Sequence, residues 1–305
     1  MTTDPQRWHI GLVGYGEVGR ILAEDLAAGG ARLVAYDVKL GGEAALPLRE
    51  HAARHAVTLV GSHAALAEAA DLVISAVTAS QAVPAALACA PAIRRGAWFL
   101  DLNSASPGAK QRAAAAIDGA GGAYVEAAVM TSVPPYRLRV PMLLGGLRAA
   151  ELQPLLAGLG FQATVASAEL GVASATKMCR SVMIKGLEAM IIEALTAARG
   201  YGVEAQVLAS LAETFPGIDW EQQAAYFFQR VIVHGRRRAE EMREAAVTVQ
   251  EAGLTPWSAS GTADRQAWMA ELADGGRFGD RAEPGFGKSP DWRVEADRIL
   301  AGLKR

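Results

Sequence analysis

The stretch IGLVGYGEVGRIL, residues 10–22, contains the glycines Gly14, Gly16 and Gly19 at the spacing G-x-G-x-x-G. It directly follows a short apolar strand that we expect at residues 9–13. Apolar side chains then recur at helical spacing, at Val18, Ile21, Leu22 and Leu26. A strand that turns into a helix around three such glycines is typical of a dinucleotide-binding βαβ unit.

Each glycine has its own physical task in such a unit. Gly14 permits the tight turn, Gly16 lets the backbone approach a pyrophosphate, and Gly19 allows close packing of helix on strand. The helix N-terminus adds free N–H groups and a partial positive charge for the phosphates. The alternative is a purely structural turn. The cofactor contacts expected here are Gly14, Tyr15, Gly16, Glu17, Val18 and Gly19.

The second expected strand, residues 32–37, ends in Asp37, which lies 23 residues after Gly14. An acidic residue at about this distance binds the ribose 2′-hydroxyl and repels a 2′-phosphate, so Asp37 predicts NAD as the cofactor. Lys39 could partner a 2′-phosphate, which leaves NADP open.

Strands and helices continue to alternate up to about residue 167, and this predicts a mostly parallel sheet. The further strands are expected at 71–77, 97–102, 123–129, 140–146 and 161–167. From there the chain is helical, with a long helix at 169–199, helices at 204–214, 220–233 and 236–252, a loop at 274–292 and a short last helix. We therefore predict an α/β Rossmann domain over residues 1–167 followed by an all-α domain over residues 168–305.

The bulk composition favours a globular protein that acts on small molecules. Of 305 residues, 51% are apolar, and the formal net charge of -2 gives no general attraction to nucleic acid or to anionic membranes. The two cysteines, Cys89 and Cys179, suit a reducing compartment. With no signal-like start and no uncharged apolar stretch of ~18 residues, we expect a cytoplasmic protein.

Polar side chains follow several expected strands, at the sheet edge where doubly wound folds bind ligands. In DLNSASP, residues 101–107, Ser106 fits a helix N-cap before proline. For Asn103 and Ser104 we expect contact with a ligand instead. The hydroxyls of EAAVMTS, residues 126–132, fit a ligand contact and an ordinary loop equally well. The expected contacts are Val77, Thr78 and Asn103 for the cofactor, and Asn103, Ser104, Thr131 and Ser132 for the substrate.

The long helix carries Lys177, Ser181 and Lys185 on one face, at i, i+4 and i+8, among apolar neighbours. We expect desolvation to lower the pKa of a lysine there, which suits an acid–base group. The alternative is a lysine whose charged end reaches solvent along the helix.

Taken together, these segments resemble the β-hydroxyacid dehydrogenase family, which includes 3-hydroxyisobutyrate dehydrogenase and 6-phosphogluconate dehydrogenase. GLVGYGEVGR looks like the cofactor loop of that family, DLNSASP like its substrate segment, and GVASATKMCRS like its catalytic lysine segment. The resemblance implies a nicotinamide-dependent dehydrogenase in which Lys177 is the general acid and base. It also implies a homodimer formed through the helical domain.

Three departures put the usual substrates of the family in doubt. Ser181 stands where members usually have asparagine, and Met130, Thr131 and Ser132 replace a serine followed by two glycines. The C-terminal segment at 234–245 also differs, and it is similar to a branch with few assigned substrates. Expected substrate contacts in the helical domain are Ser181, Lys185 and His234, with Arg180, Arg236, Arg237 and Arg238 as further cation candidates.

Two other functions stay open. An imine reductase shares this architecture but generally lacks the lysine, and a non-catalytic cofactor-binding scaffold would not need it. His51 and His55 have i, i+4 spacing, but no H-E-x-x-H pattern accompanies them. For these histidines we expect a surface helix rather than a zinc site, and we predict no metal.

Overall fold

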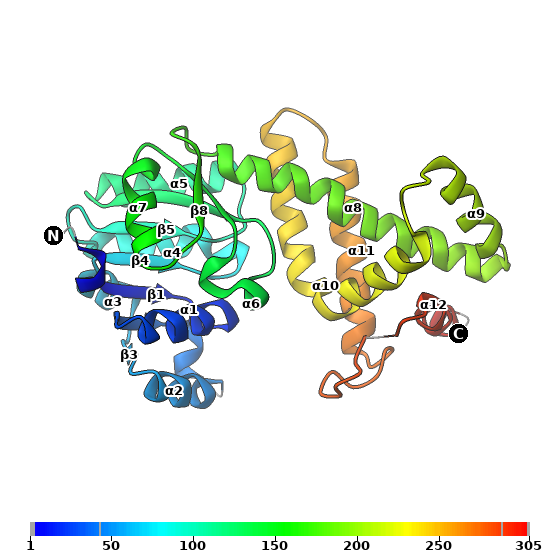
Figure 1. The fold of residues 1–305 in the computed structure, drawn as a ribbon, viewed down its shortest axis with the longest axis horizontal. Helices are drawn as coiled ribbons and strands as arrows, with labels where there is room; N and C mark the ends of the chain where they lie inside the picture. Colours follow the sequence, from blue (N-terminus) through cyan, green and yellow to red (C-terminus); the bar gives the residue numbers. More distant parts are fainter. Residues whose placement is uncertain (1–3, 43, 288, 304–305) are drawn as a thin grey trace. The chain divides into compact units, whose positions relative to one another are not determined.

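The computed structural model describes residues 4–42, 44–287 and 289–303. By its internal contacts the chain divides into two compact units, Met1–Met178 and Cys179–Arg305. The first unit, drawn blue to green in Figure 1, carries the sheet, and the second is helical. The predicted Rossmann domain followed by an all-α domain is therefore confirmed.

Within the described residues, the first unit holds one sheet of eight strands in the order β3-β2-β1-β4-β5-β6-β7-β8. The pairing is parallel except between β6 and β7, which are antiparallel. The strand order reverses between β1 and β4, and that switch point is where such sheets bind ligands. The strands are β1 (His9–Val13), β2 (Arg32–Tyr36), β3 (Thr58–Leu59), β4 (Leu72–Ser75), β5 (Trp98–Asp101), β6 (Ala123–Val129), β7 (Met142–Gly145) and β8 (Ala163–Ser167).

Helices cover both faces of this sheet, so its central strands are apolar without alternation. Along β4 and β5, Ile74 and Leu100 join one core cluster, whereas Val73 and Phe99 join the cluster on the other face. Continuous apolar runs of this kind explain why the central strands were predicted to within a few residues, whereas the two-residue strand β3 was not predicted. The helices of this unit are α1 (Glu17–Ala28), α2 (Ala45–Arg54), α3 (His63–Ala69), α4 (Ala82–Cys89), α5 (Pro107–Gly119), α6 (Val133–Tyr136) and α7 (Ala149–Gly158).

The helical region begins with α8 (Val172–Tyr201), three residues later than expected, and the division between the two units falls within this helix. It continues with α9 (Glu204–Thr214), α10 (Trp220–Glu251), α11 (Trp257–Asp274) and α12 (Trp292–Leu303). None of the helices in the described ranges is long and apolar enough to cross a membrane. Met183 and Met190 on α8 stay 73% and 62% exposed, and the dimer contact expected for this region stays a prediction.

The break expected between helices at 220–233 and 236–252 was wrong, because these residues form the single helix α10. The helix α11 was not predicted. Gly235, which lies at the expected break, is needed for the packing of α10 against α11. A Cβ there would lie 2.7 Å from the backbone oxygen of Gln266 on α11. Polar residues and Gly261 weaken the apolar periodicity that would have revealed α11.

The close contact at Gly235 predicts opposite effects for two glycine substitutions. Gly235→Ala should destabilise the protein by about 1–3 kcal/mol, because α10 and α11 must separate to admit the methyl group. Gly261→Ala is the matched control, since a Cβ there meets no described atom within 4 Å. It should stabilise α11 by about 0.5–1 kcal/mol. Urea unfolding of both variants measures the difference, and equal effects would contradict the packing role of Gly235.

Candidate active site

The glycine turn between β1 and α1 is closed by backbone contacts that exclude side chains. Gly14 has a φ of +88°, and its N–H donates to the carbonyl of Tyr36 at 2.9 Å. A Cβ on Gly14 would collide with the carbonyl of Ala76, and one on Gly19 would collide with the carbonyl of Gly14. Both positions therefore require glycine for steric reasons.

Gly16 differs from its two neighbours in the motif. A Cβ built there meets no described atom within 4 Å, so the space beside its backbone is open. Gly16 is also the N-cap of α1, and within the described chain no side chain caps that helix end. An open space beside uncapped N–H groups and the positive end of a helix dipole fits a pyrophosphate group.

Asp37 connects this turn to the loop after β2. One carboxylate oxygen accepts from the backbone N–H of Tyr15 at 2.8 Å, and the other accepts from the N–H of Lys39 at 2.9 Å. A carboxylate has about four acceptor positions, so Asp37 keeps capacity for a ribose hydroxyl. The Tyr15 side chain is fully buried, so only the backbone of Tyr15 is available for contact with a cofactor at the turn. Glu17 is exposed and Val18 is half-buried at the start of α1.

The ends of β4 and β5 are joined through the Asn103 side chain, which is buried. Its Oδ1 accepts from the backbone N–H of Val77 at 2.7 Å, and its Nδ2 donates to Ser75 Oγ at 2.9 Å. Asn103 therefore has a structural task that the sequence did not reveal, and direct contact with a ligand stays a prediction. Thr78, one residue after Val77, is exposed at this edge.

A buried ion pair between Asp101 on β5 and Lys110 on α5 stabilises the same edge of the sheet. Lys110 and Asp101 are 1% and 0% exposed, and Lys110 Nζ lies 2.9 Å from Asp101 Oδ1. The second oxygen of Asp101 accepts from the Tyr124 hydroxyl at 2.7 Å. Burial and the Asp101 charge raise the pKa of Tyr124, which keeps the hydroxyl a donor. Sequence reasoning missed this cluster. The local sequence feature that points to this cluster is the position of Lys110 on the face of α5 that also carries the buried Ala113, Ala114 and Ile117.

Glu126 on β6 is the second buried charge that the sequence did not reveal. Its Oε1 accepts from the N–H groups of Gly171 at 2.7 Å and Ala173 at 3.2 Å, and its Oε2 accepts from Ser174 N–H at 3.3 Å. The carboxylate thus binds the N-terminus of α8, where a negative charge is most favourable. Gly145 on the neighbouring strand is required here, because a Cβ would collide with the Glu126 carboxylate.

Lys177 follows one turn into α8, where its side chain is half-buried. Its Nζ donates to Ser104 Oγ at 2.5 Å, so the lysine lies against the loop that follows β5. The structure therefore brings together two residues that the sequence placed 73 positions apart. In the loop after β6, Thr131 is exposed, and Met130 and Ser132 are half-buried.

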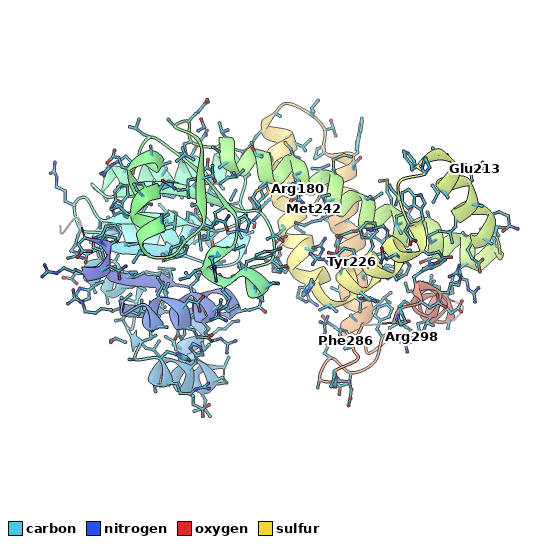
Figure 2. The ribbon with its side chains drawn as sticks, viewed as in Figure 1. Arg180, Glu213, Tyr226, Met242, Phe286 and Arg298 are labelled. Carbon is cyan, nitrogen blue, oxygen red and sulfur yellow. The ribbon has the colours of Figure 1, made fainter. Side chains whose placement is uncertain are left out.

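The cation candidates of the helical unit have carboxylate partners of their own. Lys185 Nζ lies 2.5 Å from Glu241, and burial lowers the pKa of Lys185 while the Glu241 charge opposes this shift. The other pairs are Arg237 with Glu241 at 2.6 Å, Arg238 with Glu188, and Arg236 with Asp274. Arg180, which is labelled in Figure 2, lies on α8 and is exposed.

Ser181 is buried on α8, and His234 is exposed on α10. A substrate anion would have to compete with carboxylates for Lys185 and for the paired arginines. The substrate contacts expected from Ser181, Lys185 and His234 stay predictions.

Comparison with known proteins decides the family. Residues 9–164, half of the chain, match the NAD binding domain of 6-phosphogluconate dehydrogenase. The chain belongs to the β-hydroxyacid dehydrogenase family. Residues 198–269 match a domain of unknown function, DUF1932, which agrees with the divergent helical domain expected from the sequence.

Proteins of similar sequence or structure align with most of the chain. A conserved hypothetical protein from Sinorhizobium meliloti 1021 is 36% identical, with a TM-score of 0.75 and coverage of 96% of both chains. The mitochondrial 3-hydroxyisobutyrate dehydrogenase of Drosophila melanogaster is 24% identical over 73% of this chain and 68% of its own length. The 3-hydroxyisobutyrate dehydrogenase of Mycobacterium tuberculosis shares the fold at 20% identity, with a TM-score of 0.69 over 87% of this chain and 94% of its own.

The Glu126 contact predicts a stability loss that an exposed carboxylate does not cause. Glu126→Gln places a neutral amide against three N–H donors and leaves buried groups unpaired, so it should cost about 1–3 kcal/mol. Glu169→Gln is the control. Glu169 is exposed close to the same helix end, and its substitution should change stability by less than about 0.5 kcal/mol. Denaturant unfolding compares the two variants. A Glu126→Gln protein as stable as the control would contradict the capping role.

Proposed function

We propose that this chain is an NAD-dependent dehydrogenase that interconverts a hydroxyl and a carbonyl group on a small substrate, with Lys177 as general acid and base. The observation that carries the proposal is the 2.5 Å hydrogen bond from Lys177 Nζ to Ser104 Oγ at the ligand edge of the sheet. Membership of the family and the open glycine turn support a nicotinamide cofactor. When bound, that cofactor supplies the hydride acceptor or donor.

In this proposal, residues of the chain carry out the proton transfer to and from the substrate oxygen. In oxidation, the neutral amine of Lys177 takes the proton of the substrate hydroxyl and becomes an ammonium group, and in reduction it returns a proton to the carbonyl oxygen. The Ser104 hydroxyl, hydrogen-bonded to Nζ, holds the lysine beside the loop after β5 and offers a second contact to the same substrate oxygen. Glu126 contributes indirectly, because it fixes the helix end from which Lys177 projects.

The choice of NAD rests on Asp37. Its carboxylate is buried at the end of β2 and is organised by the N–H groups of Tyr15 and Lys39. A fixed negative charge at this position favours a ribose hydroxyl and opposes a 2′-phosphate. Lys39 is exposed, so solvent and salt screen its charge more strongly than that of the buried Asp37.

Replacement of Lys177 tests the proposed chemistry. Lys177→Ala should lower kcat by about 10²–10⁴-fold and leave the affinity for NADH nearly unchanged, because only the proton-transfer group is lost. Thr176→Ala, an exposed neighbour on the same helix, is the control and should keep kcat. The assay follows the absorbance of the reduced cofactor with a panel of hydroxyacids, alkyl and aryl alcohols and cyclic imines.

The same panel separates the other functions. Reduction of cyclic imines that survives in Lys177→Ala would favour an imine reductase. Tight cofactor binding without turnover of any panel member would favour a scaffold. Near wild-type turnover of an alcohol by Lys177→Ala would contradict the proposed role of the lysine.

Asp37→Asn tests the cofactor preference with little change of shape. The loss of charge should shift the ratio of NADPH to NADH affinity toward NADPH by on the order of 10-fold, because a charge-assisted hydrogen bond contributes about 1.5–3 kcal/mol. Fluorescence titration with both reduced cofactors gives the ratio. An unchanged ratio would show that Asp37 does not select the cofactor.

A further inference from the structure

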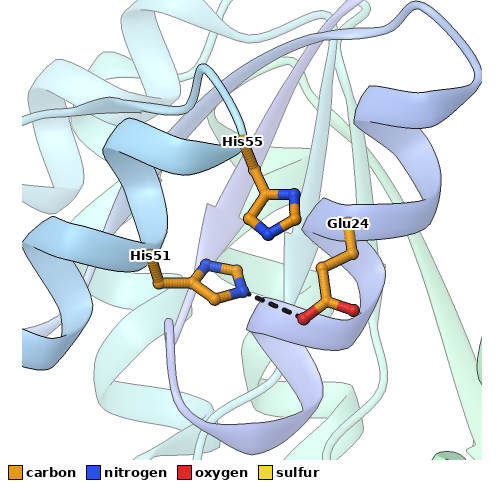
Figure 3. A group of neighbouring side chains, drawn as sticks. All are labelled: Glu24, His51 and His55. Atoms are coloured by element: carbon orange, nitrogen blue, oxygen red, sulfur yellow. Dashed lines mark hydrogen bonds and ion pairs between the residues drawn. The ribbon is translucent and has the colours of Figure 1, made fainter.

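Glu24 on α1 lies beside His51 on α2 and His55, the C-cap residue of α2, in a group that the cofactor and substrate contacts do not use (Figure 3). One ligand atom of each of the three side chains lies within 4.8 Å of the others. The histidines are one helical turn apart, and their rings stack with centroids 4.5 Å apart. Three potential metal ligands therefore lie within 4.8 Å of one another.

The distance between two of the three ligand atoms fits a small transition-metal ion. His51 Nε2 lies 3.0 Å from Glu24 Oε1. Two ligands at zinc bond lengths of about 2.0–2.1 Å and a tetrahedral angle lie about 3.3 Å apart. An ion can thus replace the proton that these two atoms share, with only a small movement of either side chain.

Two further contacts of the ligands, one buried and one partly exposed, are of the kind that orients metal ligands. His51 Nδ1 is hydrogen-bonded to the Tyr15 hydroxyl at 2.9 Å, which leaves Nε2 directed at the group. The second oxygen of Glu24 accepts from Arg137 at 2.7 Å, which leaves Oε1 for the ion. Partners on the far side of a ligating imidazole and carboxylate hold both in place for a metal.

The charge balance also allows a cation. Arg137 forms an ion pair with Asp25 as well as with Glu24, at 2.7 Å in each case. The carboxylates of Glu24 and Asp25 together outnumber this guanidinium, so the group keeps one net negative charge when the histidines are neutral. Two imidazole nitrogens and one carboxylate oxygen form a donor set that suits zinc and disfavours magnesium or calcium.

We propose that Glu24, His51 and His55 form a Zn²⁺ site that ties α1 to α2, with a water molecule as the fourth ligand. The sequence argued against a metal because the histidine pair lacks an H-E-x-x-H pattern. The third ligand is 27 residues before His51 on another helix, and no local spacing could reveal it. Because α1 is the helix of the glycine turn, the ion would stabilise the unit that holds the cofactor.

Calorimetric titration of the full chain, freed of metal with EDTA, tests the site with ZnCl₂ alone. We expect one Zn²⁺ per chain, with the affinity reduced at least ~10-fold in His55→Ala and in Glu24→Gln. His63→Ala is the matched control and should bind like the parent protein. His63 is a half-buried histidine of the same unit whose ring contacts Tyr36 instead.

Thermal unfolding in EDTA and in zinc provides a second readout that does not depend on activity. Zinc should raise the Tm of the parent protein and of His63→Ala, but not that of His55→Ala. If the parent protein does not bind Zn²⁺, or if binding survives in both ligand variants, the site does not exist. If MgCl₂ gives the same stabilisation as ZnCl₂, the proposed donor set is also wrong.

Discussion

The contact on which the site depends most is the one between the Glu126 carboxylate and the N-terminus of α8. A carboxylate with no exposed surface inside an apolar strand is costly unless every acceptor finds a donor. Here the N–H groups of Gly171, Ala173 and Ser174 meet that need, and the helix dipole adds to the attraction. The contact thereby joins the sheet to the helix that carries Lys177.

Smaller polar contacts hold the rest of the ligand edge in the same manner. Asp37 fixes the glycine turn, Asn103 joins the ends of β4 and β5, and the Asp101–Lys110 ion pair supports the loop that leads to Ser104. In each case a buried polar side chain binds the backbone of a neighbouring element. An edge organised in this way would need little rearrangement in the proposed hydride transfer, and electrostatic preorganisation of this kind lowers barriers.

Sequence reasoning was most successful where the signal is local. The central strands are apolar runs buried on two faces, and the glycine turn is a short pattern with a steric cause, so the fold and the glycine turn could be predicted. The partners of Glu126, by contrast, lie 45 to 48 residues away, and only the folded chain brings them to β6. The contact of Glu24 with His51 could not be predicted for the same reason, because the two residues are 27 positions apart. The close contact of Gly235 with Gln266 on another helix is also a property of the folded chain that no local pattern shows.

The proposed function requires Lys177 and Ser104 to lie at the point where hydride transfer takes place. A crystal structure of the chain with NADH bound would test this requirement. We expect the pyrophosphate over the glycine turn at Gly16 and the nicotinamide ring facing Lys177 Nζ, close enough for one substrate oxygen to contact both Nζ and Ser104 Oγ. A nicotinamide ring directed away from this pair, or a cofactor bound elsewhere, would contradict it.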